Sequence, residues 1–217
     1  MLARIEAAAH RVGRDPADVE LVAVSKGVSS ARLRAAVAAG LTTLGENRVQ
    51  EAEGKVAEVT GASWHLVGHL QSNKAARAAA LFEVIESVDS LDLARRLGRL
   101  AHDARDSRLL PVYLQINVDR DPNKEGWDPD TIGVDLPELL AVDGLEFRGL
   151  MTVGRQVGSS EGARPTFAAL RELSSQLRTE DARLGPGLSM GMSDDFEIAV
   201  AEGATVVRIG RAIFGAR

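Results

Sequence analysis

The sequence predicts an α/β fold, a single-domain TIM-type (β/α)8 barrel with one additional helix before the first strand. Short apolar, β-rich runs alternate with longer helical segments along the chain, and this alternation repeats eight times. It implies parallel strands joined by right-handed crossovers. Eight units could close a barrel or form an open, doubly wound sheet. The count of eight favours the barrel, and so do the polar residues that end most strands, because a barrel gathers these ends at one mouth.

The first half of the chain supplies four strand–helix units. After the N-terminal helix and a turn at 13–16, strands are expected at 21–26, 42–46, 64–68 and 84–88. Ser29 caps the helix that follows the first strand, and Gly40 ends it. The next three helices are expected at 48–59, 73–82 and 91–104.

The second half supplies the other four units. Residues 110–118 form the strongest strand, followed by a polar loop at 119–128 and a short helix near 137–142. Further strands are expected at 147–153, 188–192 and 205–210, with helices at 164–177 and 194–202. The sequence has no linker and no low-complexity tract, so residues 1–217 are expected to form one domain.

The composition excludes several classes of protein. Hydrophobic residues make up 45% and charged residues 26%, which is a globular rather than a disordered composition. Lys and Arg number 26 against 31 Asp and Glu, and the net charge of −5 argues against a general nucleic-acid or membrane-surface binder. The chain has no cysteine, which excludes disulfides, thiolate metal sites and cysteine nucleophiles. No apolar run reaches the roughly 18 residues of a membrane span, and residues 1–12 lack the apolar core of a signal peptide, so a cytoplasmic protein is expected.

Lys26 is the first candidate for chemistry at the mouth. Strand alternation places it on the same face as Val22 and Val24, at the end of the first strand. A lysine there can simply extend into solvent, or a partly buried amine can act as the nucleophile that forms a Schiff base. Spacing alone does not separate these interpretations. The polar residues expected at the mouth are Lys26, Glu46, His69, Asp89, Asn117, Thr152, Ser193 and Arg208.

Two loops expected at the same mouth have the composition of an anion site. Ser193 leads from the seventh strand into a helix, an arrangement that simple helix capping would also explain. Arg208, Gly210 and Arg211 lie at the end of the eighth strand. Helix N-termini attract anions, and barrels frequently bind phosphate at the loops after strands seven and eight. The phosphate interpretation is therefore favoured.

His65 and His69 suggest a metal site, but their spacing rejects it. Four residues along a strand span roughly 13 Å, too far for one shared ion. Because Gly68 interrupts the strand, we expect His69 at the mouth and His65 within the packed barrel. The Asp and Glu residues form no cluster with metal-ligand spacing, so no metal is expected. The sequence also lacks a dinucleotide or P-loop fingerprint and a nucleophile elbow.

Six segments of the chain form a recognisable set. They are LVAVSK at 21–26, GENRVQE at 45–51, WHLVGHLQSNK at 64–74, GLMT at 149–152, LSMGMS at 188–193 and VRIG at 207–210. They run in order, at normal spacing, from about residue 21 to Gly215, and HLQSNK and SMGMS are very specific. Together they resemble the pyridoxal-phosphate homeostasis protein family.

The resemblance implies a fold like the N-terminal barrel of alanine racemase and a pyridoxal 5′-phosphate (PLP) cofactor held as a Schiff base on Lys26. It implies that Asn47 lies near the PLP ring. Two positions depart from the family: Arg211 stands where a small hydroxyl residue is usual, and Gly27 stands where threonine is frequent. The Arg211 side chain could contact the phosphate or point away from it. The residues implied at the phosphate end of the pocket are Ser193, Arg208, Gly210 and Arg211.

The resemblance also implies a carrier or regulator of PLP and of amino- and keto-acid balance, with no established turnover and no catalytic residue. Racemisation needs a second base, and the single tyrosine, Tyr113, lies in a strand that looks buried. The alternative is a PLP-dependent amino-acid racemase of low activity with water as the second base. A class I aldolase would also combine a barrel, a lysine and a phosphate site, but aldolase lysines usually lie on later strands.

The expected partners are PLP and PLP-dependent apoenzymes, with no nucleic acid and no membrane. A monomer or weak dimer is expected, because the second domain that completes a racemase dimer is lacking. The charges on the helices are typical of solvated faces, for example Arg95, Arg96, Arg99, Asp103 and Arg105.

Overall fold

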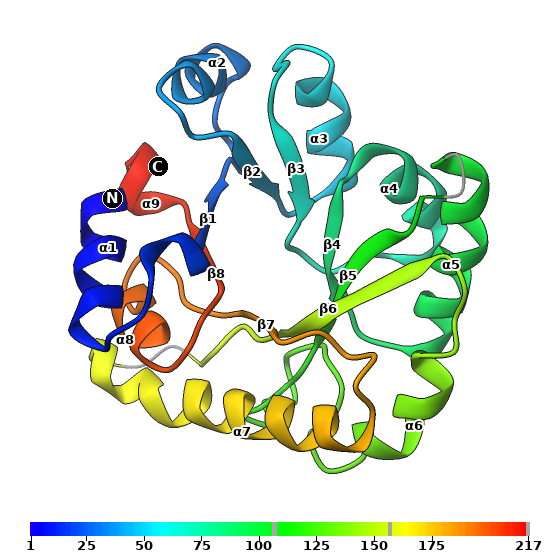
Figure 1. Ribbon diagram of the computed structural model, residues 1–217. Coiled ribbons are helices and arrows are strands. Elements are labelled where there is room, and N and C mark those ends of the chain that lie inside the picture. Colours follow the sequence, from blue (N-terminus) through cyan, green and yellow to red (C-terminus); the bar gives the residue numbers. More distant parts are fainter. Residues whose placement is uncertain (106–107, 156–157, 216–217) are drawn as a thin grey trace.

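The computed structural model describes residues 1–105, 108–155 and 158–215, and it has a closed barrel of eight parallel strands (Figure 1). The strands follow one another around the barrel in sequence order, and β1 closes it by pairing with β8. The predicted α/β barrel is therefore confirmed. The strands are β1 Glu20–Val24, β2 Thr43–Glu46, β3 Ser63–Leu66, β4 Val84–Val88, β5 Leu110–Gln115, β6 Leu145–Met151, β7 Gly187–Ser189 and β8 Val206–Ile209.

Helices surround the barrel, and α1 is the additional N-terminal helix (Figure 1). It packs on α8, where the Arg4 guanidinium lies 4.8 Å from the centre of the Phe196 ring. In the described ranges, no helix is both long enough and apolar enough to cross a lipid bilayer. The helices are α1 Leu2–Arg11, α2 Ser30–Ala38, α3 Val49–Val56, α4 Ala75–Leu81, α5 Leu91–Ala104, α6 Ile132–Leu139, α7 Arg164–Glu180, α8 Phe196–Ala201 and α9 Arg211–Phe214, with 3-10 helices at Pro16–Asp18, Ser72–Lys74 and Ser160–Ala163.

Helix α6 differs from its predicted extent. It begins at Ile132 rather than near residue 137, and Pro137 lies inside it. Proline is tolerated best in the first turn of a helix, so a helix that begins five residues before Pro137 was not expected. Ile132, Leu136 and Leu139 are buried at helical spacing. The apolar face therefore determines where this helix lies, in spite of the proline.

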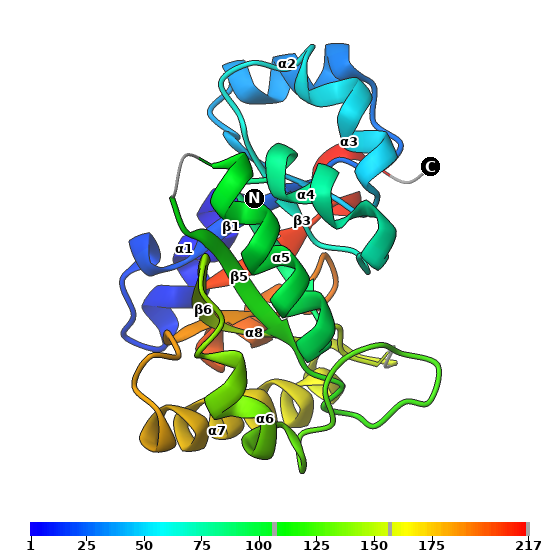
Figure 2. The same cartoon turned by 90° about the vertical axis from the view of Figure 1, so that its right-hand side faces the viewer.

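Several strands end earlier than predicted, because the buried apolar run continues after the backbone has bent away from the strand. β5 ends at Gln115, and the Asn117 N–H then donates to the Trp127 carbonyl over 2.9 Å. The connection from β5 to α6 projects from the barrel (Figure 2). β7 ends at Ser189, and Gly191 bends the chain with a φ of +93°.

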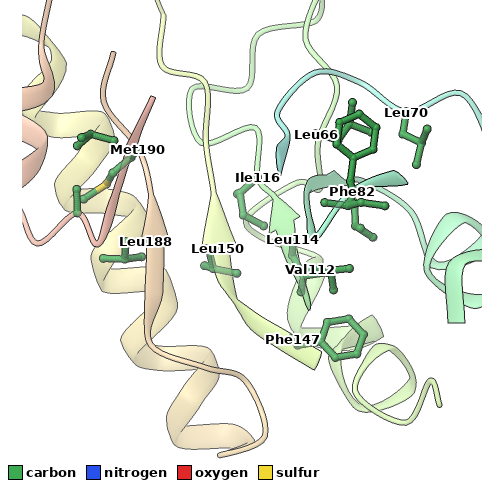
Figure 3. Packing of buried hydrophobic residues seen from close by; sticks show 14 of the residues in the cluster. Leu66, Leu70, Phe82, Val112, Leu114, Ile116, Phe147, Leu150, Leu188 and Met190 are labelled. Atoms are coloured by element: carbon green, nitrogen blue, oxygen red, sulfur yellow. The ribbon is translucent and has the colours of Figure 1, made fainter. Parts of the chain in front are cut away.

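The barrel wall separates two cores. The larger lies between the strands and the helices, and Figure 3 shows part of it, including Val112, Leu114 and Phe147. Strand alternation places every second residue on the opposite face, so Tyr113 lies inside the barrel. Fully burying one valine or methionine side chain in such a core stabilises the folded state by about 1.5–3 kcal/mol. The inner core consists of Val22, Val67, Val84, Tyr113, Met151 and Val206.

One charge expected on a solvated face is buried. Arg105 is 6% exposed and donates to the Phe82 carbonyl and to the Glu83 carboxylate, each at 2.9 Å. The prediction for Arg105 was wrong, because its guanidinium satisfies the carboxyl end of α4. Of the other charges predicted with it, the side chain of Asp103 lies outside the described residues, and Arg95, Arg96 and Arg99 are exposed as expected.

Candidate functional site

A cavity of about 1180 Å³ opens at the carboxyl ends of the barrel strands. Its walls come from the segments after β1, β2, β3, β6, β7 and β8. The structure brings the predicted lysine and the two predicted anion loops to one space. The six residues singled out from the sequence all line this cavity: Lys26, Asn47, Ser193, Arg208, Gly210 and Arg211.

Lys26 lies in a tight turn directly after β1 and is half-buried. The Val28 N–H donates to the Ser25 carbonyl over 2.9 Å, and Gly27 has a φ of +71°. A positive φ at the third position is characteristic of a type II turn and favours glycine there. Threonine at residue 27 would strain the turn that carries Lys26, which accounts for the glycine.

A buried cluster of Ser25, Glu46 and Lys55 holds this turn from behind. The Ser25 hydroxyl donates to Glu46 Oε1 over 2.6 Å. Lys55 Nζ, on α3, donates to the same oxygen over 2.5 Å and to the Ser25 carbonyl over 2.8 Å. Glu46 is fully buried, and the Lys55 side chain is 14% exposed. The cluster fixes the positions of Lys26 and Asn47, because these residues directly follow Ser25 and Glu46.

Four residues expected at the mouth line neither of the cavities described for this region, and each bonds to the chain instead: Glu46, Asp89, Asn117 and Thr152. Glu46 lies behind the wall, as above. The Asn117 amide donates to the Asp121 carbonyl over 2.8 Å, and the Thr152 hydroxyl donates to the Ile116 carbonyl over 2.8 Å. They were expected at the mouth because each lies near the end of a predicted strand, and sequence position does not show that the side chain bonds to the chain instead. Lys55 was missed altogether, because a lysine on a surface-type helix gives no signal that it is buried.

Buried polar residues fill the barrel interior and reach the floor of the cavity at Arg208. His65 Nδ1 and Ser189 Oγ lie 2.7 Å and 2.5 Å from the Glu86 carboxylate. The Arg208 guanidinium lies 3.8 Å from Glu86 and donates to Ser189 Oγ and to the Thr152 carbonyl. Burial opposes ionisation of Glu86, but its contacts with His65, Arg208 and Ser189 hold its pKa below the ordinary value. The expectation that His65 lies within the packed barrel is confirmed, since it is 2% exposed.

The loops after β7 and β8 join each other at the rim of the cavity. The Ala212 N–H donates to Ser193 Oγ over 3.3 Å. The Arg211 guanidinium forms an ion pair with Asp194, and its side chain is 69% exposed. The Arg211 side chain therefore belongs to the surface of the rim, where Asp194 neutralises it.

The cavity is positively charged although the chain is acidic overall. Among the residues that line it, five are basic and only Asp194 and Asp195 are acidic. The whole chain has a net charge of −5. Clefts lined by charge of one sign concentrate ligands of the opposite sign. The cavity therefore favours an anion, and its basic residues are Lys26, Arg32, Arg155, Arg208 and Arg211.

A second cavity, of about 700 Å³, adjoins the first, because Lys26 and Asn47 line both. Its other walls are the segments that follow β2 and β3. Gly68 lets these segments meet, since a Cβ atom on this residue would lie 2.4 Å from the Asn47 carbonyl oxygen. His69 lines the second cavity, as its predicted position at the mouth requires.

His69 also belongs to a cluster that the sequence did not predict. One ligand-type atom each of His69, Asp89 and Glu125 lies within 4.8 Å of the others, so the expectation that no such cluster exists was wrong. The three residues come from different strand ends, which is why sequence spacing did not show them. Burial raises the pKa of Asp89. His69 acts in the opposite direction, and its Nδ1 lies 2.9 Å from Asp89 Oδ2. His69 and Glu125 are exposed, and their proximity alone does not indicate a metal.

Known proteins resemble this chain over its whole length. Residues 2–217 match the family model described as alanine racemase, N-terminal domain. The pyridoxal phosphate homeostasis protein of Pseudomonas aeruginosa is 44% identical, and the match covers 99% of this chain and 92% of that protein. This chain belongs to the pyridoxal phosphate homeostasis protein family. PipY of Synechococcus elongatus is 41% identical to this chain. Its structure without PLP matches with a TM-score of 0.88 and covers 99% of each chain. Its structure with PLP bound matches with a TM-score of 0.86 and covers 99% of this chain and 100% of PipY.

The segments that resemble the pyridoxal phosphate homeostasis proteins in sequence lie around the two cavities. Residues 188–193 and 207–210 contribute to the first cavity. Residues 45–51 and 64–74 contribute to both. The most specific motifs of this family member are therefore those that build the walls of its mouth.

Proposed function

We propose that this protein binds PLP in the first cavity through a Schiff base on Lys26 and acts as a carrier or regulator of PLP and of amino- and keto-acid balance. Residues 1–217 would then work as a single PLP-binding barrel domain. PLP supplies an aldehyde that condenses with a lysine amine and a phosphate with nearly two negative charges. The observation that carries the proposal is one cavity that combines the half-buried Lys26 with the loops after β7 and β8 and an excess of basic residues, in an acidic chain.

The residues present fit this ligand. Lys26 supplies the amine from the end of β1, and Asn47 lies on the shared wall, where it can face the ring. Ser193, Gly210 and Arg211 line the side of the cavity formed after β7 and β8, where barrels often bind phosphate. Because the Arg208 side chain is bound to Ser189, Thr152 and Glu86, we assign it to support the cavity floor beneath the ring rather than to hold phosphate. PipY of S. elongatus, which has a structure with PLP bound, supports the choice of ligand.

The proposal is tested by loading the purified protein with PLP and recording its absorption spectrum. We expect a yellow protein whose visible absorbance is bleached by borohydride, because reduction converts the imine into a stable amine. If no visible band forms, or if the band is lost together with free PLP during dialysis, covalent binding is contradicted.

Whether substrate is turned over is decided by a different assay. Amino acids are incubated with the loaded protein in deuterated buffer, and exchange of the α-proton is compared with that in free PLP. We propose that no faster exchange occurs. Tyr113 is 6% exposed inside the barrel, and burial raises its pKa, which makes it unsuited to act as the second base. Exchange well above the rate in free PLP would favour the racemase alternative.

Arg208→Gln is expected to weaken PLP and pyridoxal equally. The substitution removes the guanidinium from Ser189 and Thr152 on the cavity floor, while Glu86 keeps His65 as a partner. These contacts lie within the protein, so their loss loosens the cavity floor and should weaken both ligands by the same factor. Equilibrium dialysis of both ligands measures the effect, and a loss confined to PLP would show that Arg208 holds the phosphate.

Arg211→Thr, which introduces the residue type usual in the family, is expected to be nearly neutral. The Arg211 side chain is exposed and pairs with Asp194, and surface ion pairs contribute only about 0–1 kcal/mol. We expect the Kd for PLP to change by less than about fivefold, which 1 kcal/mol would allow. Fluorescence titration with PLP measures it, and a tenfold weakening would indicate that the guanidinium leaves Asp194 to contact the phosphate.

We also propose that the protein is cytoplasmic and monomeric and that it delivers PLP to PLP-dependent apoenzymes. The exposed charges of α5, for example Arg95 and Arg99, support a solvated helix face. Sedimentation of the loaded protein tests the monomer. Recovery of activity by an apoenzyme mixed with the loaded protein, faster than with an equal amount of free PLP, tests delivery.

A further inference from the structure

The second cavity has no role in the function proposed above, although Lys26 forms part of its wall. We propose that this cavity binds a free α-amino acid, with Arg48 and Lys74 holding the carboxylate beside Lys26. This inference extends the proposed function, because the amino acid would lie against the residue that carries PLP.

Unpaired positive charge is the first argument. Arg48 follows β2 and Lys74 follows β3, and both line the cavity. Within the described residues, no carboxylate lies in ion-pair distance of either side chain, whereas the nearby Lys55 and Arg77 pair with Glu46 and Glu53. Two unneutralised cations from separate loops, facing one space, attract an anion.

The rest of the lining selects a zwitterion over a purely anionic ligand. Glu51 is the single acidic residue in the lining and can accept a hydrogen bond from an ammonium group. Three amide side chains can donate and accept hydrogen bonds. They are Asn47, Gln50 and Gln71. An α-amino acid has one charge of each sign, as this mixed lining does, and the volume of about 700 Å³ lies within the roughly 300–1,000 Å³ usual for small-molecule sites.

The surroundings of the cavity also disfavour a phosphate dianion. His69 lines the cavity and contacts Asp89 at 2.9 Å, and Glu125 lies beside this pair. The negative charge at this edge repels a dianion more strongly than a ligand with no net charge. The first cavity has the larger excess of basic residues, five against two acidic ones, compared with three against one in the second.

The test measures binding to PLP-free protein by calorimetry, with L-alanine, L-alaninamide and inorganic phosphate as probes. L-Alaninamide has the same side chain and amino group as L-alanine but no carboxylate. We expect L-alanine to bind and L-alaninamide to bind at least about tenfold more weakly, because a charge-assisted contact is lost. Phosphate should bind more weakly than L-alanine.

Variants then assign the site. Arg48→Gln and Lys74→Gln should each weaken L-alanine by about tenfold to hundredfold. Arg77→Gln is the matched control, because it removes one exposed charge outside the cavity and should leave the affinity unchanged. Circular dichroism checks that each variant is folded.

Some results would overturn the amino-acid site, and another would show a site for simple anions. No binding of L-alanine at millimolar concentrations, equal binding of L-alaninamide, or affinities unchanged in both variants would overturn the inference. Tighter binding of phosphate, lost in the same variants, would show a simple anion site instead. PLP loading of the wild type is measured on separate samples, so a failure of the proposed function is seen independently of the alanine result.

Discussion

Lys26→Ala is expected to yield a folded barrel that forms no covalent PLP adduct. Lys26 is half-buried in a turn at the mouth and belongs to neither apolar core, so its removal should change stability by less than about 1 kcal/mol. Without its amine, the aldehyde of PLP has no partner at the meeting point of the two cavities. The measurement is visible absorbance after loading, followed by dialysis, with thermal unfolding to confirm the fold.

Two further variants sharpen this result. Lys26→Arg keeps the positive charge and removes the primary amine, so it should lose the adduct as completely as the alanine variant. Lys124→Arg makes the same change at a lysine that donates to the carbonyls of Val153 and Gly154, and it should keep the adduct. A full adduct in either Lys26 variant would show that another amine carries the cofactor.

Lys55→Met is expected to destabilise the protein by about 3–5 kcal/mol, the usual result of removing one partner of a buried ion pair. Glu46 is fully buried, and its Oε2 has no hydrogen-bond partner among the described residues. Lys55 is the cation that contacts its other carboxylate oxygen, so the variant leaves a buried charge with only the Ser25 hydroxyl. Urea unfolding of both proteins measures the difference.

A double variant separates charge from packing in this cluster. Glu46→Gln combined with Lys55→Met removes both charges, so it should recover a substantial part of the lost stability. Because the cluster fixes Ser25 and therefore the Lys26 turn, Lys55→Met should also slow formation of the PLP adduct. A loss below about 1 kcal/mol in the single variant would show that water or a shifted side chain neutralises Glu46.

The sequence was sufficient for the fold and for six of the residues that line the first cavity, for a physical reason. Parallel strands that alternate with helices place all strand ends at one mouth, so Lys26, Ser193 and Arg208 had to approach one another. The residue at each strand end can be predicted from the local pattern of the sequence. Its hydrogen-bond and ion-pair partners cannot be predicted in this way, since they come from distant parts of the chain.

The interactions that the sequence did not show are long-range ones. The contacts of Arg208 with Thr152 and Glu86 cross the barrel interior, and Lys55 reaches β1 from a helix after β2. Arg105 was expected in solvent for the same reason, because its partners lie at the end of another helix. Charge patterns along one element predict an exposed face, and only the packing of neighbouring elements reveals which charges are buried.

The central claim, that Lys26 carries PLP, is tested most directly by locating the cofactor in the chain. The chain has four lysines, which are Lys26, Lys55, Lys74 and Lys124. The loaded protein is reduced with borohydride and digested, and mass spectrometry identifies the peptide that has gained the reduced pyridoxyl phosphate group. We expect stoichiometric modification of the peptide that contains Lys26, with the other three lysines unmodified. Modification confined to Lys74 or Lys124, or a chain that gains no pyridoxyl group, would contradict it.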